Sequence, residues 1–216
     1  MIKHELTKRV LSSLILLPIV FFVIIEGSIL FNLFISICLI ITVYEWLKMS
    51  KANTQKIFGL LFLIISFYSI FKIRNDFNQD YFHILLIAII CVSTDTGGYF
   101  FGKLLKGPKL TKLSPNKTYA GVIGSFLLTI IITILFFELT SKIHNFRLSA
   151  ETFVFVLLVS FVSQMGDIII SYFKRLSKIK DTGKIIPGHG GILDRIDGII
   201  FAYPFSYLVF LNWNFQ

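Results

Sequence analysis

The sequence predicts an all-α fold, a polytopic integral membrane helical bundle of about seven transmembrane helices with polar loops on the cytoplasmic side. Of its 216 residues, 55% are hydrophobic and 15% are charged, and the mean hydropathy is +0.79. Soluble domains carry about 25% charged residues, so this chain is too apolar for that class. The apolar residues are also gathered into runs of the right length to cross a membrane.

The predicted spans are apolar runs of roughly 20 residues, the length at which an α-helix crosses the hydrocarbon core. The fourth and seventh give the weakest signal because each has a short apolar core or a polar end. A basic start followed by an apolar run resembles a signal peptide, but no small-residue cleavage site follows it, so we expect a retained first helix. The runs cover about residues 10–25, 29–47, 57–73, 82–101, 119–139, 152–173 and 196–213.

The basic residues predict the orientation. When the N-terminus is placed in the cytoplasm, all of the 21 lysines and arginines except Lys72, Arg74, Lys142 and Arg147 fall on the inner side. This matches the positive-inside rule and accounts for the net charge of +9 without a nucleic-acid partner, which we do not expect. The two cysteines lie inside predicted spans, so no disulfide framework or zinc site is expected.

We expect one transmembrane domain over residues 1–216, with scaffold helices in residues 1–80 and the chemistry in residues 93–200. The scaffold half contains apolar helices and short basic turns. Glu45 lies at the cytoplasmic end of the second span, and its position predicts an interfacial charge that reaches water. No internal repeat mirrors the acids or the Gly/Pro breaks, which weakens an inverted-repeat transporter.

The first polar cluster, residues 93–99, lies in the cytoplasmic half of the fourth span. An ionised Asp at the bilayer centre costs about 2.5–3.5 kcal/mol on insertion scales. Asp95 should therefore lie near the interface or have a cation or a hydrogen-bond donor as partner, and it is a candidate substrate-binding residue. Alternatively, Asp95 is a snorkelling charge and the neighbouring glycines serve close helix packing.

The second cluster is the lysine-rich loop of residues 102–121. Ser114 followed by Pro115 is typical of a helix N-cap and first helical residue, which places Lys117 and Thr118 in the first turn of the fifth helix. Free backbone N–H groups and the helix dipole favour an anion there, so we expect Lys117 to hold a phosphate. The alternative is that these lysines only satisfy topology and contact anionic lipid headgroups.

The third cluster runs from the sixth span to the mouth of the last. Ser163, Asp167, Ser171 and Lys174 follow at i, i+4, i+8 and i+11, so they share one helix face, which should face the bundle interior or a wet cavity rather than lipid. Glycines near residue 189 permit close approach of a ligand, and successive N–H groups can form an anion nest. Further members of the cluster are Arg175, Lys180, Asp181, His189, Gly190, Gly191, Asp194, Arg195 and Asp197.

The carboxylates of this cluster predict a divalent cation. Asp167, Asp194 and Asp197 are hard oxygen donors of the type that Mg²⁺ accepts when it also binds phosphates and waters. A second cation such as K⁺ is an open alternative, and metal ligation by His189 is not required. Carboxylates for a cation, basic groups for phosphates and glycines for access together predict a site for a phosphorylated substrate at the cytoplasmic surface.

These residues resemble the phosphatidate cytidylyltransferase (CDP-diglyceride synthetase, CDP-diacylglycerol synthase) family, strongly over residues 93–200. Two departures are the lower length relative to typical members and Tyr119-Ala120, where many members carry Trp-Glu or Trp-Gln. The signature is occupied by Ser171, Lys174, Arg175, Lys180, Asp181, Gly183, the run from Pro187 to Gly191, Asp194, Arg195 and Asp197. Two upstream segments that also resemble the family contain Asp95, Thr96, Tyr99 and Gly102, then Ser114, Pro115, Lys117, Thr118 and Gly121.

The resemblance implies CMP transfer from CTP to phosphatidic acid, in a bacterial inner membrane with the N-terminus and active site cytoplasmic. A homodimer is an open alternative. The implied Mg²⁺ ligands are Asp167 and Asp194, with Asp197 and Asp95 secondary. Phosphates would be held by Lys117, Lys174 and Arg175, and the nucleotide end would be shaped by Lys180, His189 and Arg195. The other implied substrate-binding residues are Ser114, Thr118, Ser171, Asp181, Gly190 and Gly191.

Three alternative functions can be compared with this one. A polyprenol kinase would also use a phosphorylated substrate, but the complete Pro-Gly-His-Gly-Gly-x-x-Asp-Arg-x-Asp run argues against it. An ion-coupled transporter could bury Asp95 and Asp167, yet the external loops carry little polar machinery. A CDP-alcohol phosphotransferase is disfavoured because its Asp-Gly-x-x-Ala-Arg motif does not occur.

Overall fold

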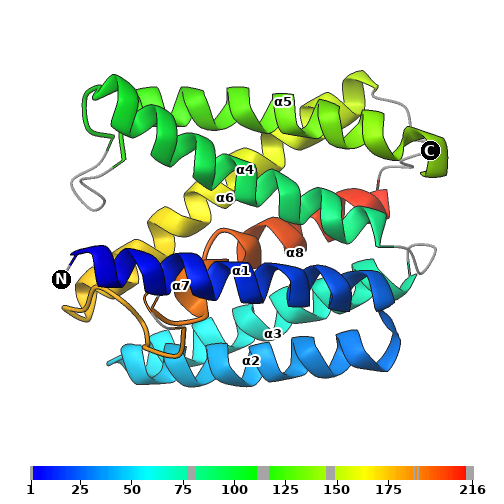
Figure 1. Ribbon diagram of the computed structural model, residues 1–216. Helices are drawn as coiled ribbons and strands as arrows, with labels where there is room; N and C mark the ends of the chain where they lie inside the picture. Colours follow the sequence, from blue (N-terminus) through cyan, green and yellow to red (C-terminus); the bar gives the residue numbers. More distant parts are fainter. Residues whose placement is uncertain are drawn as a thin grey trace. The chain divides into compact units, whose positions relative to one another are not determined.

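The computed structural model describes residues 2–76, 81–110, 117–144, 149–186, 188 and 190–212, and within these ranges it contains helices and no strand. Two isolated antiparallel bridges, Lys109 with Thr118 and Ile186 with Gly190, close loops. The all-α prediction is confirmed. The helices are α1 (Ile2–Glu26), α2 (Ser28–Met49), α3 (Asn53–Asp76), α4 (Phe82–Leu105), α5 (Tyr119–His144), α6 (Ala150–Leu176), α7 (Leu193–Ile196) and α8 (Ile199–Asn212) (Figure 1).

Five of the described helices are long and apolar enough to cross a membrane, namely α2 to α6, and the chain is an integral membrane protein. The expected first span lies within the 25-residue α1, whose stretch Leu14–Glu26 is apolar, and the expected seventh span appears as the shorter apolar helix Ile199–Asn212. At 1.5 Å per residue, the 14 residues of α8 reach about 21 Å, which is less than the roughly 30 Å of a hydrocarbon core. The described residues therefore support five spans, and the count of seven stays a prediction.

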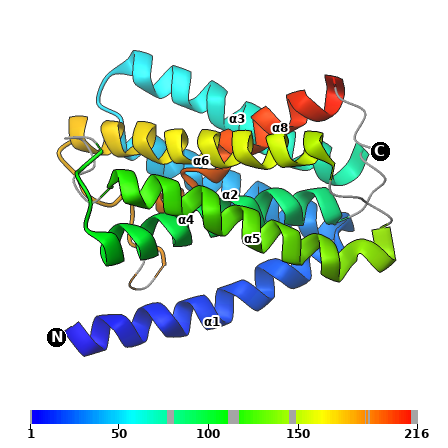
Figure 2. The same cartoon turned by 90° about the horizontal axis from the view of Figure 1, so that it is seen from above.

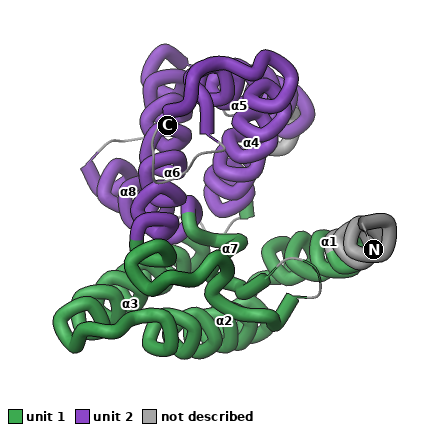
Figure 3. Tube along the Cα trace, turned by 90° about the vertical axis from the view of Figure 1, so that its left-hand side faces the viewer, with its two compact units in different colours: residues 1–81, 173–197 green, residues 82–172, 198–216 purple. Residues whose placement is uncertain are grey.

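The chain forms two compact units (Figure 3). Unit 1 consists of residues 1–81 and 173–197, and unit 2 consists of residues 82–172 and 198–216. The chain passes from one unit to the other after Tyr81, inside α6 and after Asp197. The predicted scaffold thus shares a unit with the segment that carries most of the third polar cluster, while the division into a scaffold and a catalytic core stays a prediction.

In unit 1, α2 and α3 pack through an aromatic side chain and a glycine. The indole of Trp46 occupies the space where a side chain at Gly59 would lie, and its Nε1–H donates to the carbonyl of Gln55 at 3.1 Å. The indole also meets Phe173 edge to face, with ring centroids 5.1 Å apart. These contacts bury Trp46 and fix the end of α2, the helix that carries Glu45.

The turn between α1 and α2 is held by a buried arginine of α3. Gly27 has φ of +64°, a conformation that suits glycine, and the Arg74 guanidinium occupies the space beside it. Arg74 Nε donates to the carbonyl of Ile24 at 3.2 Å, which satisfies a carbonyl group at the end of α1. The three scaffold helices are thus connected at this end by one side chain.

In unit 2, α4 and α5 lie side by side (Figure 2). Their contact depends on glycines: a Cβ on Gly97 would come within 2.7 Å of the Gly124 carbonyl oxygen, and a Cβ on Gly121 within 2.8 Å of the Gly98 carbonyl oxygen. Small residues allow this close approach between membrane helices. The packing role proposed for the glycines beside Asp95 is therefore confirmed.

Buried hydroxyl groups connect α4, α5 and α6. The Thr94 and Thr129 hydroxyls lie 3.0 Å apart, and Thr94 Oγ1 donates to Ser160 Oγ at 2.8 Å. Ser125 Oγ donates to the Thr94 carbonyl at 2.8 Å. Hydrogen bonds between membrane helices contribute about 0.6 kcal/mol each on average, so the network adds specificity to packing that the glycines permit.

Candidate active site

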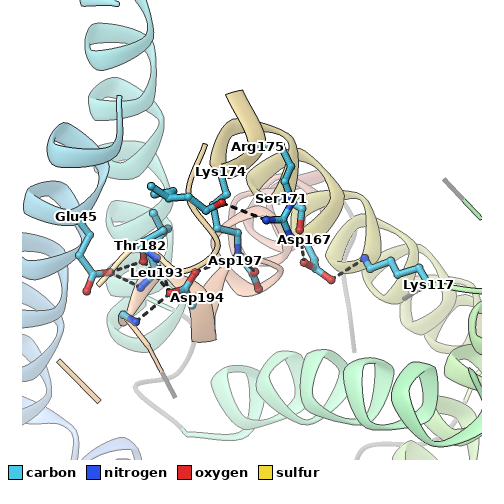
Figure 4. A network of polar contacts seen from close by, with 12 residues as sticks. Glu45, Lys117, Asp167, Ser171, Lys174, Arg175, Thr182, Leu193, Asp194 and Asp197 are labelled. Atoms are coloured by element: carbon cyan, nitrogen blue, oxygen red, sulfur yellow. Dashed lines mark hydrogen bonds and ion pairs between the residues drawn. The ribbon is translucent and has the colours of Figure 1, made fainter. Parts of the chain in front are cut away.

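Asp194, at the start of α7, is the centre of a polar cluster in unit 1 (Figure 4). Its Oδ2 accepts hydrogen bonds from the backbone N–H of Thr182 at 2.8 Å and of Gly191 at 3.0 Å. The Thr182 hydroxyl lies 3.1 Å from the same oxygen. The carboxylate thus ties two parts of the 181–193 loop to the short helix that follows it.

Lys174, in the last turn of α6, neutralises this carboxylate. Its Nζ lies 3.0 Å from Asp194 Oδ1 and 3.7 Å from Asp197 Oδ2. The side chains of Lys174 and Asp194 are only 10% and 3% exposed, so the interaction is poorly screened by water. The three residues were predicted as site residues, and the structure brings them together.

Glu45 belongs to the same cluster, contrary to the sequence prediction of an interfacial charge that reaches water. Its residue exposure is 1%. Its Oε2 accepts from the N–H of Leu193 at 2.8 Å and its Oε1 from the N–H of Ile192 at 3.1 Å, while the Thr182 hydroxyl lies 3.1 Å from Oε2. The prediction was wrong because the loop, which comes far later in the sequence, covers the end of α2.

Successive N–H groups of this segment bond to carboxylates of the chain itself, while an anion nest for a ligand stays a prediction. The successive N–H groups of Gly191, Ile192 and Leu193 bind Asp194 or Glu45. The N–H of Gly190 bonds to the Ile186 carbonyl at 3.2 Å, and Gly190 has φ of +93°. Substrate binding by Gly190 and Gly191 stays a prediction.

In unit 2, Lys117 and Asp167 form a second ion pair, with Lys117 Nζ 2.6 Å from Asp167 Oδ2. Lys117 also donates to the carbonyl of Gln164 at 3.2 Å, and Ser171 Oγ donates to Asp167 Oδ1 at 3.3 Å (Figure 4). The two charged side chains are 24% and 27% exposed, so the pair is only partly buried. In the predicted polar stripe of α6, Ser163 and Lys174 are buried and Asp167 and Ser171 are partly buried, as expected for a face that is turned away from lipid.

The start of the fifth helix differs from the sequence prediction. The helix begins at Tyr119 rather than at residue 115, and Thr118 is its N-cap, with Oγ1 accepting from the Gly121 N–H at 3.0 Å. The Leu110 N–H bonds to the Lys117 carbonyl at 2.8 Å, next to the bridge between Lys109 and Thr118. This pairing holds Lys117 and Thr118 extended, before the helix.

The remaining predicted residues lie at the surface or outside the described residues. Ser114 and His189 are outside the described residues, so nothing follows for them. Arg175 is exposed and its Nη1 donates to the Ile179 carbonyl at 3.2 Å. Exposed side chains are also found at Asp95, Lys180, Asp181 and Arg195.

A divalent cation fits the chemistry of these carboxylates. Among the described residues, no group of three or more His, Cys, Asp or Glu side chains gathers as a ready metal site. However, Asp194 and Asp197 share the ammonium group of Lys174. The Asp194 and Asp197 carboxylates thus already attract one cation, the Lys174 ammonium. Carboxylate oxygens are also the ligands that Mg²⁺ prefers.

Sequence reasoning missed two members of the cluster, Glu45 as a buried acceptor and Thr182 as the donor between two carboxylates. A signal for Glu45 was present, since an acid directly after a long apolar run needs a donor or a cation if it is not in water. Thr182 stands at a variable position of the signature and gave no signal.

Comparisons with known proteins agree on one family. The sequence model of the cytidylyltransferase family matches residues 7–73 and 57–213. Phosphatidate cytidylyltransferases of Rickettsia conorii and Rickettsia bellii are 33% and 34% identical to the chain over 213 residues, which is 96% of this chain and 92% and 91% of those proteins. The phosphatidate cytidylyltransferase of Brucella suis is 35% identical over 172 residues, 79% of this chain and 61% of that protein. The chain thus has nearly the length of its Rickettsia relatives.

Proposed function

Because this chain belongs to the cytidylyltransferase family, we propose that it is a membrane nucleotidyltransferase that transfers CMP from CTP to phosphatidic acid. The products are CDP-diacylglycerol, a precursor in phospholipid synthesis, and pyrophosphate. The observation that carries the proposal is the similarity to relatives of this name over 96% of the chain.

The reaction joins two anions, and this determines what the protein must supply. A phosphomonoester oxygen of phosphatidic acid attacks the α-phosphorus of CTP, and the bond from that phosphorus to the oxygen bridging to the β-phosphate breaks. Catalysis consists mainly of aligning two groups that repel each other and of neutralising charge in the transition state. Fixed basic side chains perform both tasks.

In unit 2, Lys117 is suited to hold a phosphate. Its ammonium is held by Asp167 and by the Gln164 carbonyl, so its position is set before substrate arrives. A phosphate oxygen can replace one of these acceptors because the pair is only partly buried. Ser171, which donates to Asp167, keeps that carboxylate in place during the exchange.

In unit 1, Lys174 is the buried cation and Arg175 is the exposed one. Lys174 is fixed between Asp194 and Asp197, whereas the Arg175 side chain bonds a backbone carbonyl and faces solvent. We propose that Lys174 neutralises developing charge and that Arg175 attracts the incoming polyphosphate. We propose that the nucleotide end is shaped by Lys180, His189 and Arg195. Substrate would also be contacted by Asp95, Ser114, Thr118 and Asp181.

We propose Mg²⁺ as the cofactor, with Asp194 and Asp197 as its ligands in unit 1, while ligation by Asp167 stays a prediction. When bound, the cation supplies positive charge to the phosphate oxygens of CTP. The support is the chemistry of the carboxylates and their shared attraction for lysine ammonium groups. A second cation such as K⁺ stays a prediction, as does a homodimer.

The orientation is also proposed from the charges. With the N-terminus inside, the lysine-rich loop before α5 and the 174–195 segment both face the cytoplasm, where CTP is found. The inner membrane of a bacterium is the proposed location. Its support is the positive-inside pattern together with the bacterial sources of the relatives.

The test is CDP-diacylglycerol formation by the purified chain in detergent with CTP, Mg²⁺ and phosphatidic acid. Asp194 is a poor choice for the inactive control because its carboxylate also holds the loop. Lys117→Gln removes a charge at a partly exposed position, and we expect kcat/KM to fall about ten- to a hundredfold through loss of a charge-assisted contact.

Lys109→Gln is the matched control. Lys109 is exposed and belongs to the same loop, and its backbone bridges to Thr118, the residue next to Lys117. We expect its kcat/KM to stay within about twofold of the wild type. Folded wild-type protein that makes no product at any Mg²⁺ or K⁺ concentration would refute the proposed function and reopen the lipid-kinase and transporter alternatives.

A further inference from the structure

Glu45 is a buried carboxylate with three hydrogen-bond donors, all from one loop. The donors are the N–H groups of Ile192 and Leu193 and the hydroxyl of Thr182. A buried ionised carboxylate is costly unless donors satisfy it, and bonds from N–H groups to a charged acceptor are among the stronger ones in proteins. Glu45 comes from the predicted scaffold and is separated from Leu193 by 148 positions in sequence.

Two glycines of the signature make room for this carboxylate. A Cβ on Gly183 would lie 2.5 Å from Glu45 Oε1, and a Cβ on Gly191 would lie 2.5 Å from both carboxylate oxygens. Neither glycine has a positive φ. Space, rather than backbone conformation, therefore accounts for glycine at these two positions. Gly183 leaves room for Glu45, and Gly191 leaves room for Glu45 and for the Thr182 hydroxyl, which would be nearest to its Cβ.

The carboxylate of Glu45 accepts hydrogen bonds at the start of α7. The N–H groups at the start of a helix have no acceptor within the helix, and two of those at the start of α7 bond to Glu45. Asp194 follows Leu193 directly. Its own carboxylate shares the Thr182 hydroxyl with Glu45, each at 3.1 Å.

The consequence reaches the charged residues of the site. Asp194 and Asp197 lie on and just after α7, and both face the ammonium of Lys174. If the start of α7 moves, both carboxylates move with it relative to Lys174. Glu45 itself contacts the loop backbone and Thr182 in this arrangement.

We propose that Glu45 is a positioning residue for the transferase reaction. Its carboxylate, inserted between Gly183 and Gly191, holds the start of α7 and thereby sets Asp194 and Asp197 against Lys174. This role rests on the proposed function for its catalytic consequence, whereas the loop-holding role itself can be measured without any activity.

Glu45→Gln is the sharpest variant because it keeps the shape and removes one acceptor. Glu45 Oε1 serves Ile192 and Oε2 serves Leu193. Whichever way the amide is turned, its NH₂ group faces one of these N–H groups, which loses its acceptor. Glu45→Asp keeps the charge but is one methylene too short, and it provides a second variant if Glu45→Gln does not fold.

The measurements are hydrogen–deuterium exchange and steady-state kinetics on the folded protein in detergent. In Glu45→Gln we expect peptides that cover residues 182–193 to exchange about tenfold faster or more, with the rest of unit 1 unchanged. We expect kcat per folded molecule to fall by a similar factor. Glu45→Asp should lie between this variant and the wild type in both measurements.

Glu151→Gln is the matched control because Glu151 is an exposed acid in the first turn of α6. It should match the wild type in both measurements. Wild-type exchange over residues 182–193 in both Glu45 variants would overturn the proposal. Faster exchange throughout the chain would also overturn it, since that result indicates a general loss of stability.

The two proposals fail separately. If the wild type makes no CDP-diacylglycerol, the proposed function fails, and localised exchange in Glu45→Gln still supports the loop-holding role. If the wild type is active and Glu45→Gln shows localised exchange with unchanged kcat, the positioning role in catalysis is overturned.

Discussion

At the scale of single residues, the main feature is the burial of charge around α7. Asp194 and Asp197 have side chains that are 3% and 11% exposed, and Lys174 is the cation that faces both. Removing charges from water costs several kcal/mol per ion, so such a group is stable only when every charge has a partner. Each member of this group therefore depends on the others.

Replacement of Lys174 tests this dependence. Lys174→Met should lower the free energy of unfolding by about 3–5 kcal/mol because it leaves two buried carboxylates without their cation. Lys174→Arg keeps the charge and should therefore lower the free energy of unfolding by less than Lys174→Met does. Thermal or denaturant unfolding in detergent measures the difference.

The Lys72–Asp76 pair provides the control for this change. It is an i,i+4 pair with side chains 29% and 46% exposed. Lys72→Met should therefore cost less than about 1 kcal/mol. Equal losses for Lys174→Met and Lys72→Met would mean that burial does not strengthen the Lys174 pair.

At the scale of elements, the contact between α4 and α5 is set by glycines. Gly97 and Gly98 are neighbours, but a Cβ on each would meet a different kind of atom. On Gly97 it would lie 2.7 Å from the Gly124 carbonyl oxygen and 2.9 Å from the Ser125 Cα, which are backbone atoms. On Gly98 it would lie 2.9 Å from the Ser125 hydroxyl, which can rotate away.

The pair Gly97→Ala and Gly98→Ala separates packing from helix propensity. Both changes stabilise a helix by the same amount, about 1 kcal/mol, because Ala has a higher helix propensity than Gly. Gly97→Ala should still destabilise the protein, by about 1–3 kcal/mol, because the two helix backbones must move apart. Gly98→Ala should be close to neutral. The measurement is the unfolding midpoint of each variant in detergent. A lower midpoint for Gly98→Ala than for Gly97→Ala would contradict the proposed role of Gly97 in the contact.

At the scale of the whole molecule, the distribution of basic residues predicts the orientation in the membrane. Lys51 lies between α2 and α3 and Glu151 at the start of α6, and both are exposed. Because successive predicted spans cross the membrane in opposite directions, Lys51 should lie in the cytoplasm and Glu151 outside. Both positions are therefore accessible to a water-soluble thiol reagent from one side only.

Cysteine labelling in whole cells tests this orientation. Cysteine at Glu151 should react with a membrane-impermeant maleimide in intact cells, whereas cysteine at Lys51 should react only after the membrane is opened. The wild type gives the background, since Cys38 and Cys91 both lie within spans. The reverse pattern would show that the proposed active site faces away from the cytoplasm.

The sequence by itself determined the class of protein, the chemistry and the family. Apolar runs predict membrane helices because their length and composition are local properties. Of the third cluster, Lys174, Asp194 and Asp197 do lie together, and these residues are close in sequence. The spacing of Asp167 and Ser171 also predicted their contact, since i and i+4 are neighbours on any helix.

The tertiary structure alone decided which groups became partners. Glu45 accepts bonds from residues 137 to 148 positions away, and Lys117, in the loop before α5, pairs with Asp167 of α6, so no local pattern could indicate these partners. Thr118, which was predicted in the first turn of the fifth helix, instead bridges to Lys109. The physical reason is the same in each case: a buried polar group takes the nearest donor or acceptor that packing supplies, and packing joins segments that are distant in the sequence.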